Sequence, residues 1–105
     1  EEDIPSHTGE VYLTMGKPGQ GKGGHYHPEA VEWFTVIEGE AVLQLEDIAT
    51  HERRDIEMSL EKAITVFIPN NVVHIVKNNF DKEFILLPYT NKLYDPKDTI
   101  FYIIK

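Results

Sequence analysis

Two histidines, His25 and His27, stand two positions apart in the segment Gly-Gly-His-Tyr-His-Pro. In an extended segment alternate side chains point to the same side, so we expect both imidazoles to face one point. Glu32 follows five positions later, where an apolar run typical of a buried strand begins. A buried carboxylate without a partner is costly, and a cation would satisfy it. Two imidazoles and one carboxylate suit a divalent transition metal, and zinc, iron, manganese, nickel and copper all accept this set.

A second segment, residues 63–78, supplies another histidine. A β-branched run meets a turn at Pro69-Asn70-Asn71, and the strand expected after the turn carries His74 on the same face as two valines. A single histidine in a strand is more often an ordinary core or surface residue than a ligand. Taken with the spaced pair and the glutamate, the pattern predicts a metal site whose ligands are His25, His27, Glu32 and His74.

These residues resemble the two motifs of the cupins. The first motif is matched at every spacing by Gly19, His25, His27, Glu32 and Gly39. The second motif is matched by Pro69, His74 and Asn78, while Ala63 and Asn71 stand where the family usually has glycine. Because asparagine tolerates positive φ better than most residues, we expect the turn at Asn71 to survive.

The resemblance covers roughly residues 9–90 and implies an all-β fold, a double-stranded β-helix or jelly-roll cupin barrel, with the metal inside. The residue patterns agree with it: about eight short strands separated by turns are expected, and no run has helical periodicity over ten residues. One of these strands is a half-buried segment over 10–15, another is a final strand over 99–104, and residues 47–55 form a loop. No repeat or linker is apparent, so residues 1–105 are predicted to form a single cupin domain.

Composition limits the classes of partner. The chain has 105 residues, 41% of them hydrophobic, with no cysteine and a formal net charge of −8. No apolar run approaches the about 20 residues of a membrane helix, and a strongly negative charge disfavours nucleic acid as a partner. We therefore expect a small-molecule substrate, no nucleic-acid or membrane partner, no signal peptide and a cytoplasmic location.

A second, weaker resemblance is to the small cupin domains of polysaccharide biosynthesis. It rests on Lys22-Gly23-Gly24-His25-Tyr26-His27 near the start and on Tyr94-Asp95-Pro96-Lys97-Asp98-Thr99, followed by Phe101-Tyr102, near the end. It implies an epimerase or isomerase that removes a proton beside the ketone of a 4-keto sugar nucleotide. If the site holds no metal, His25 is the candidate base; no other catalytic residue is assigned.

Two alternatives stay open. The complete ligand set with iron would also suit a dioxygenase of a small chelating substrate. The absence of a clear second acid–base pair instead suits a cupin that binds a sugar or organic acid without turnover. In each case the resemblance implies a homodimer, and strands that are apolar on both faces permit one.

Several other residues have expected places. Glu29 is expected at the surface, Asn78 is expected to orient His74 or the turn, and His7 and His51 are expected in solvent. Lys22 is expected on a mobile loop rather than on an anionic substrate group. Four aromatic residues are candidate cavity walls, although ordinary packing is the preferred interpretation: Tyr26, Trp33, Phe67 and Tyr89.

Overall fold

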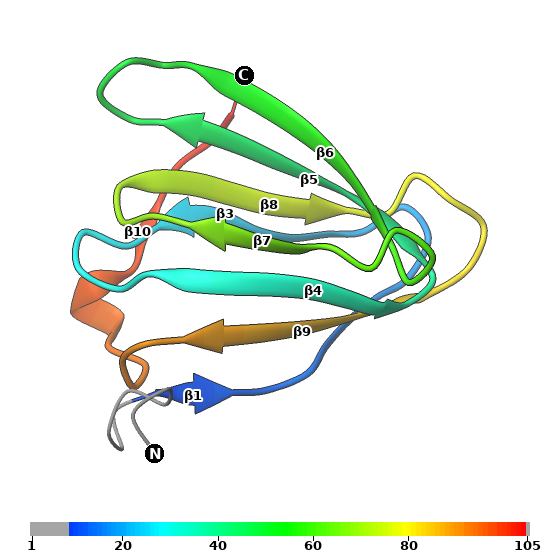
Figure 1. The fold of residues 1–105 in the computed structure, drawn as a ribbon. Coiled ribbons are helices and arrows are strands. Elements are labelled where there is room, and N and C mark those ends of the chain that lie inside the picture. Colours follow the sequence, from blue (N-terminus) through cyan, green and yellow to red (C-terminus); the bar gives the residue numbers. More distant parts are fainter. Residues whose placement is uncertain (1–8, 105) are drawn as a thin grey trace.

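The computed structural model of the chain describes residues 9–104, so His7 lies outside the described residues. Within this range ten strands form two antiparallel five-stranded sheets that face each other (Figure 1). The first sheet has the order β1 (Glu10–Val11), β9 (Phe84–Thr90), β4 (Glu32–Glu38), β7 (Thr65–Ile68), and β2 (Thr14–Gly16) also pairs with β9. The second has the order β10 (Ile100–Phe101), β3 (Gly21–Tyr26), β8 (Val72–Lys77), β5 (Glu40–Asp47), β6 (Arg53–Ser59). This jelly roll confirms the predicted fold class.

The hydrophobic core fills the space between the two sheets. Strand residues alternate between the two faces, and the inward-facing positions are apolar on both sheets. Phe34 and Phe84 of the first sheet lie in one buried cluster with Leu43, Met58 and Val76 of the second. The cluster fills one part of the jelly roll. The predicted ligands, which are polar, lie at the other end, in or directly after β3, β4 and β8.

The segment predicted as one strand over residues 10–15 is two short strands. Pro88 lies in β9 opposite the interruption, and proline has no N–H to donate to a neighbouring strand. The backbone N–H of Tyr12 still reaches the Pro88 carbonyl oxygen at 3.3 Å. The predicted burial was wrong here, because Val11, Leu13 and Met15 are exposed.

Two other boundaries differ from the predicted ones, and the first lies where charged residues extend a hairpin. β5 runs to Asp47 and β6 begins at Arg53, so the predicted loop over 47–55 is shorter than expected. Near the end of the chain, the 3-10 turn η1 (Pro96–Asp98) precedes β10, which is shorter than the strand predicted over 99–104. Between residues 9 and 104 no helix is long and apolar enough to cross a membrane.

Candidate functional site

The structure brings all four predicted ligands together at one end of the jelly roll. His25 in β3 lies directly opposite His74 in β8, His27 follows β3, and Glu32 begins β4. The three histidines offer ring nitrogens that all lie within 4.8 Å of one another. The Nε2 atoms of His27 and His74 lie 3.1 and 3.2 Å from Oε1 of Glu32.

A β-bulge in β3 sets the position of His25. The pairing between β3 and β8 shifts register between Gly23 and His25, and Gly23 and Gly24 have φ of 109° and 83°. These values favour glycine, which has no Cβ to clash. A Cβ on Gly23 would lie 2.7 Å from the carbonyl oxygen of His74. The bulge therefore interrupts the regular alternation of β3 and turns His25 toward His74.

Backbone carbonyls fix the direction in which two imidazoles present their lone pairs. A carbonyl oxygen only accepts, so Nδ1–H of His27 donates to the Asp98 carbonyl at 2.8 Å. Nδ1–H of His74 likewise points at the Val72 carbonyl at 3.4 Å. In the neutral rings both Nε2 atoms then carry lone pairs, and both face the carboxylate of Glu32.

Glu32 is 4% exposed, and its Oε1 is buried without a hydrogen-bond partner although two ring nitrogens lie within ion-pair distance. Three groups that present lone pairs to one another repel unless a proton or a cation lies between them. Ligands held at about 2.0–2.2 Å from a single ion lie about 3.0–3.5 Å apart. The separations around Oε1 and the mixed nitrogen and oxygen donors fit a divalent transition metal.

The pKa shifts reflect burial and the proximity of these groups. Burial lowers the pKa of His74 to about 4, and burial and His27 lower the pKa of His25. Burial alone would lower the pKa of His27, but the Glu32 carboxylate and the Asp98 carbonyl raise it above its usual value. Burial acts to raise the pKa of Glu32, but His27 and His74 outweigh it and hold the pKa below the usual value. The carboxylate is therefore ionised at neutral pH.

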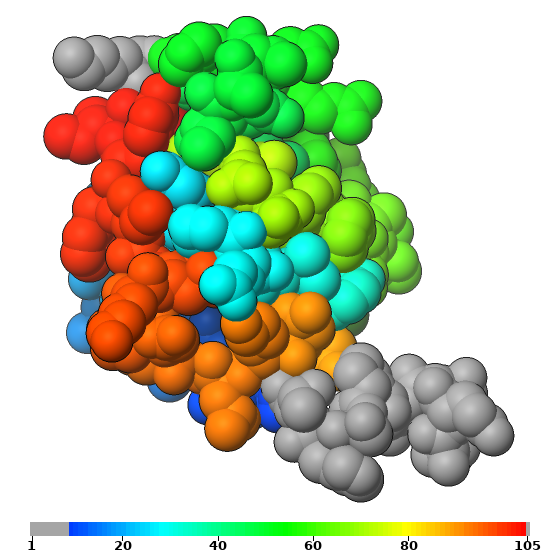
Figure 2. Space-filling model, turned by 90° about the vertical axis from the view of Figure 1, so that its left-hand side faces the viewer, coloured from blue at the N-terminus to red at the C-terminus, as the bar shows by residue number. Residues whose placement is uncertain are grey.

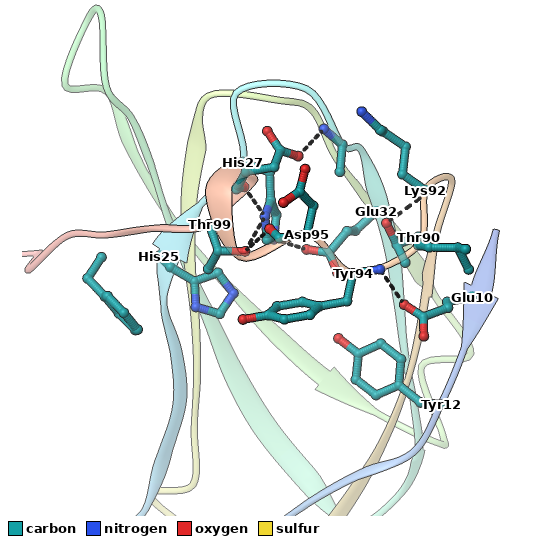
Figure 3. A pocket seen from close by; sticks show the side chains of 14 residues that line it. Glu10, Tyr12, His25, His27, Glu32, Thr90, Lys92, Tyr94, Asp95 and Thr99 are labelled. Atoms are coloured by element: carbon teal, nitrogen blue, oxygen red, sulfur yellow. Dashed lines mark hydrogen bonds and ion pairs between the residues drawn. The ribbon is translucent and has the colours of Figure 1, made fainter. Parts of the chain in front are cut away.

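A cavity of about 420 Å³ opens directly onto His25, His27 and Glu32 (Figure 3). In the described part of the chain its other charged lining residues are three carboxylates and one lysine: Glu10, Asp95, Asp98 and Lys92. The remaining lining residues include Tyr12, Tyr94 and Phe101. The side chain of Tyr12 points into the cavity, and burial, Glu32 and Glu10 raise its pKa to about 12. Its hydroxyl therefore stays protonated and available as a donor.

Sequence reasoning missed Tyr12, Glu10 and Asp98. Glu10 and Tyr12 lie in a segment whose alternation predicted only a half-buried strand. Asp98 lies in the stretch that resembles the small cupin domains of polysaccharide biosynthesis, and that resemblance assigns it no role. Its carboxylate accepts the backbone N–H groups of Glu29 and Ala30 at 2.8 and 2.9 Å.

The four candidate wall aromatics do not line this cavity. Trp33 of β4 packs between Phe67 and Tyr89, with ring centroids 5.3 and 5.2 Å apart, on the outer face of the first sheet. Tyr26 packs against Tyr102. Packing, the preferred interpretation, is what the structure shows. Lys22 is also absent from the cavity lining, but the predicted loop position was wrong, because Lys22 lies in β3 and pairs with Val76 of β8.

The remaining expectations have mixed outcomes. Glu29 is exposed, as predicted, and pairs with Lys92. Asn78 holds the turn and not His74: its amide donates to the Gly16 and Lys82 carbonyls, and its Oδ1 accepts from Phe80 N–H. His51 is exposed but also contacts the buried carboxylate of Glu46 at 2.9 Å.

Comparisons with known proteins agree on one group. The chain is 28% identical over 88 residues to a UDP-2-acetamido-2,6-beta-L-arabino-hexul-4-ose reductase of Pseudomonas aeruginosa PA103, covering 84% of this chain and 24% of that protein. The capsular polysaccharide assembling protein CapF of Staphylococcus aureus has 29% identity and a TM-score of 0.87, covering 94% of this chain and 28% of that chain. The ketoisomerase QdtA of Thermoanaerobacterium thermosaccharolyticum shares the fold, with a TM-score of 0.78 and 20% identity over 93% of this chain and 69% of that one.

The chain thus spans only about a quarter of the reductase and of CapF. The sequence model of one family, described as the polysaccharide biosynthesis C-terminal domain, matches residues 4–102. That match includes both histidine segments, Glu32 and the stretch that contains η1. The chain therefore belongs to the polysaccharide biosynthesis C-terminal domain family.

Proposed function

We propose that His25, His27, Glu32 and His74 bind a divalent transition metal and that the cavity beside them acts on a sugar nucleotide. The observation that carries the metal proposal is Oε1 of Glu32, which is buried without a hydrogen-bond partner and faces two imidazole nitrogens. A bound metal would polarise a ketone oxygen of the substrate and so acidify the neighbouring C–H.

Related proteins also suggest a probe for the metal. CapF has been crystallised with the inhibitor 3-isopropenyl-tropolone. A tropolone carries adjacent carbonyl and hydroxyl oxygens, a pair that chelates divalent metals. Zinc-loaded protein should therefore bind tropolone, and metal-free protein should not.

Metal analysis of protein purified without added metal or an affinity tag tests the site directly. We expect the wild-type chain to retain a transition metal and His74→Ala to lose it, with zinc affinity falling by more than the about 10–100-fold typical of outer-shell changes. His51→Ala is the matched control, because His51 lies in a hairpin loop and contacts Glu46 instead of the cluster. Equal zinc affinity in wild type and His74→Ala would refute the assignment.

The sugar-nucleotide proposal rests on the cavity and on what related proteins bind. QdtA has been crystallised with TDP-4-keto-6-deoxyglucose, and the Pseudomonas protein is named for a UDP-linked 4-ulose. The carboxylates of the cavity can accept hydrogen bonds from sugar hydroxyls, and Tyr94 and Phe101 offer aromatic faces at its mouth. Phosphate groups would meet several carboxylates and one lysine inside, so the sugar end is the part expected to enter.

The chemistry that this arrangement supports is proton transfer at the carbon beside the ketone. A base on the histidine side removes the proton; in the ion-free chain this base is His25. The C–H electron pair moves into the carbon–carbon bond, and the ketone oxygen becomes an enolate. Tyr12 enters from the N-terminal segment and gives its hydroxyl proton to the same carbon from the other face. The ketone reforms, the protonated base releases its proton to water, and water returns a proton to the Tyr12 phenolate.

Incubation with a panel of 4-keto sugar nucleotides in D₂O tests this reaction. Mass spectrometry should find deuterium at the carbon beside the ketone. Exchange that requires added zinc would assign His25 to the metal, and exchange that persists with a chelator would assign it as the base. Binding of the sugars with no exchange on long incubation would instead support a binding domain without turnover.

We further propose that the chain forms a homodimer through the outer face of its first sheet. This face is defined by Val11, Met15, Trp33, Phe67 and Tyr89, of which Val11, Met15 and Phe67 are exposed. Exposed apolar patches of this kind are typical of protein–protein interfaces. The cytoplasmic location expected from the sequence stays a prediction, and cell fractionation would measure it.

A further inference from the structure

The 3-10 turn η1 lies against the loop that connects two of the candidate ligands. Residues 28–31 link His27 to Glu32, and Asp98 at the end of η1 contacts both His27 and this loop. Figure 2 shows the same arrangement at the surface, with the segment around η1, in orange, beside the loop after β3, in cyan. We infer that Asp98 is a positioning residue, which orients His27 and fixes the loop between His27 and Glu32.

The backbone carbonyl of Asp98 acts on the ring of His27. It accepts the Nδ1–H of His27 at 2.8 Å, and the hydroxyl of Thr99 lies 3.5 Å from the same nitrogen. With its proton held on Nδ1, a neutral His27 carries the lone pair on Nε2, the atom that lies 3.1 Å from Glu32. Outer hydrogen bonds of this kind set the tautomer and the orientation of a metal-binding histidine.

The side chain of Asp98 acts on the loop. Asp98 is 7% exposed, and each of its carboxylate oxygens accepts one backbone N–H, from Glu29 at 2.8 Å and from Ala30 at 2.9 Å. Charge-assisted hydrogen bonds such as these are the stronger kind. Because the loop leads directly into Glu32, its position determines how far Oε1 lies from the two imidazoles.

The position of Asp98 is itself fixed locally. Asp95 caps η1 by accepting the N–H of Lys97 at 2.9 Å, and Pro96 stands at the start of the turn with its φ already suited to it. The chain therefore contains two aspartates three positions apart in one turn. Only Asp98 touches the ligand loop, which makes Asp95 a natural control.

This inference rests on the proposed metal site, but it can be tested separately. In wild-type protein, NMR should show His27 with its proton on Nδ1 and protected from solvent exchange, and it should show protected amides at Glu29 and Ala30. In Asp98→Ala these signals should lose protection, and zinc affinity should fall by about 10–100-fold. Asp98→Asn keeps the size and one acceptor, so its zinc affinity should lie between those of wild type and Asp98→Ala. Asp95→Asn keeps the side-chain oxygen that caps η1, so it should keep the wild-type affinity and the wild-type His27 signal.

The contrary outcomes are distinct. An unprotected His27 Nδ1–H in the wild-type chain overturns the inference without any variant. So does an unchanged zinc affinity in a folded Asp98→Ala or Asp98→Asn, or an equal loss in Asp95→Asn. If the wild-type chain binds no zinc, the metal proposal fails, whereas the His27 and loop signals in the variants still decide the role of Asp98.

Discussion

At the scale of single residues, Glu32 is the point on which the site depends. It is buried, it stays ionised, and it faces imidazole nitrogens whose protons are directed elsewhere by backbone carbonyls. Net negative charge in a buried position is costly until a positive charge arrives. The wall on the other side of the cavity carries Tyr12, whose hydroxyl keeps its proton at neutral pH.

Replacing Tyr12 with phenylalanine should separate two parts of the proposed reaction. The base on the histidine side would still remove and return the substrate proton on one face, so deuterium would still enter from D₂O. Inversion at that carbon requires a donor on the other face, and it should fall by about 10²–10⁴-fold, the usual contribution of a positioned acid. Chiral chromatography of the product, together with mass spectrometry, measures both quantities.

Tyr26→Phe is the control for this experiment, because Tyr26 packs against Tyr102 and does not line the cavity. It should leave both exchange and inversion at the wild-type level. Equal loss of exchange and inversion in Tyr12→Phe would mean that Tyr12 does not act as the donor on the opposite face.

The residues that the sequence could identify are those with a fixed local spacing. His25 and His27 stand two positions apart, so alternation predicts that they face one side, and Glu32 follows closely at the start of the next apolar run. Tyr12 could not be found in this way, because its direction depends on a break in pairing opposite Pro88, which is distant in the chain. Asp98 escaped for the same reason: its hydrogen bonds reach residues about 70 positions away.

At the scale of elements, two turns contain a residue other than glycine with a positive φ. Ala63 and Asn71 stand where the cupin motif usually has glycine, and both have positive φ, 50° and 63°. The N–H of Asn71 donates to the His27 carbonyl at 2.9 Å, so this turn also supports the site. The turn thus survives without glycine, as the sequence predicted for Asn71.

Ala63→Gly should stabilise the protein. The left-handed conformation costs an L-residue about 1–2 kcal/mol, and glycine removes this cost. Glycine also raises the entropy of the unfolded chain, which offsets about 0.4–1 kcal/mol of the gain. We expect a net gain of about 0.5–1 kcal/mol in the free energy of unfolding, measured by urea denaturation. Ala49→Gly, in a turn without positive φ, is the control and should destabilise. A loss of stability in Ala63→Gly would contradict the assigned backbone conformation.

The end of the chain is tied to β5 by a buried carboxylate. Glu46 is 2% exposed and accepts hydrogen bonds from His51, from Tyr102 at 2.8 Å and from Arg53 at 2.9 Å. The contact with His51, followed by those with Tyr102 and Arg53, holds the pKa of Glu46 below its usual value of 4.5. Tyr102 follows β10, so this contact helps to keep one wall of the cavity in place.

Because the pKa of Glu46 is lower in the folded chain, its stabilisation is present above pH 4.5 and is lost as the pH falls further, toward the folded-state pKa. Glu46→Gln should be less stable than wild type at neutral pH, and the difference should shrink in acid. Urea midpoints across the acid range measure it. Glu57→Gln, which removes an exposed pair with Lys62, should keep the wild-type acid dependence; a constant gap for Glu46→Gln would contradict the linkage.

At the scale of the whole molecule, the first sheet has one face on the core and one apolar face in solvent. The sequence predicted that the strand over 31–38 is apolar on both faces and that a second subunit could cover one of them, and Trp33 on the outer face of β4 agrees with that pattern. The exposure of Val11 and Met15 on the same sheet was not predicted. What the sequence could not give was the pairing of distant strands. The order β1-β9-β4-β7 joins segments from both ends of the chain, and local periodicity carries no information about it.

Light scattering at micromolar concentration tests the dimer. Wild-type protein should have twice the 12.1 kDa mass of one chain, and Phe67→Glu should shift it to the mass of one chain, because it places a charge in the apolar contact. Phe101→Glu is the control, since Phe101 is 81% exposed but belongs to the second sheet. A wild-type mass of 12.1 kDa would end the proposal.

The hydrogen bond between Asp98 and His27 spans 71 positions of sequence, and it has a consequence for biosynthesis. Contacts between distant residues form late in folding. During translation, the three histidines of the cluster and Glu32 emerge from the ribosome well before η1 does. The nascent chain therefore cannot fix the orientation of His27 through Asp98 until η1 has left the ribosome.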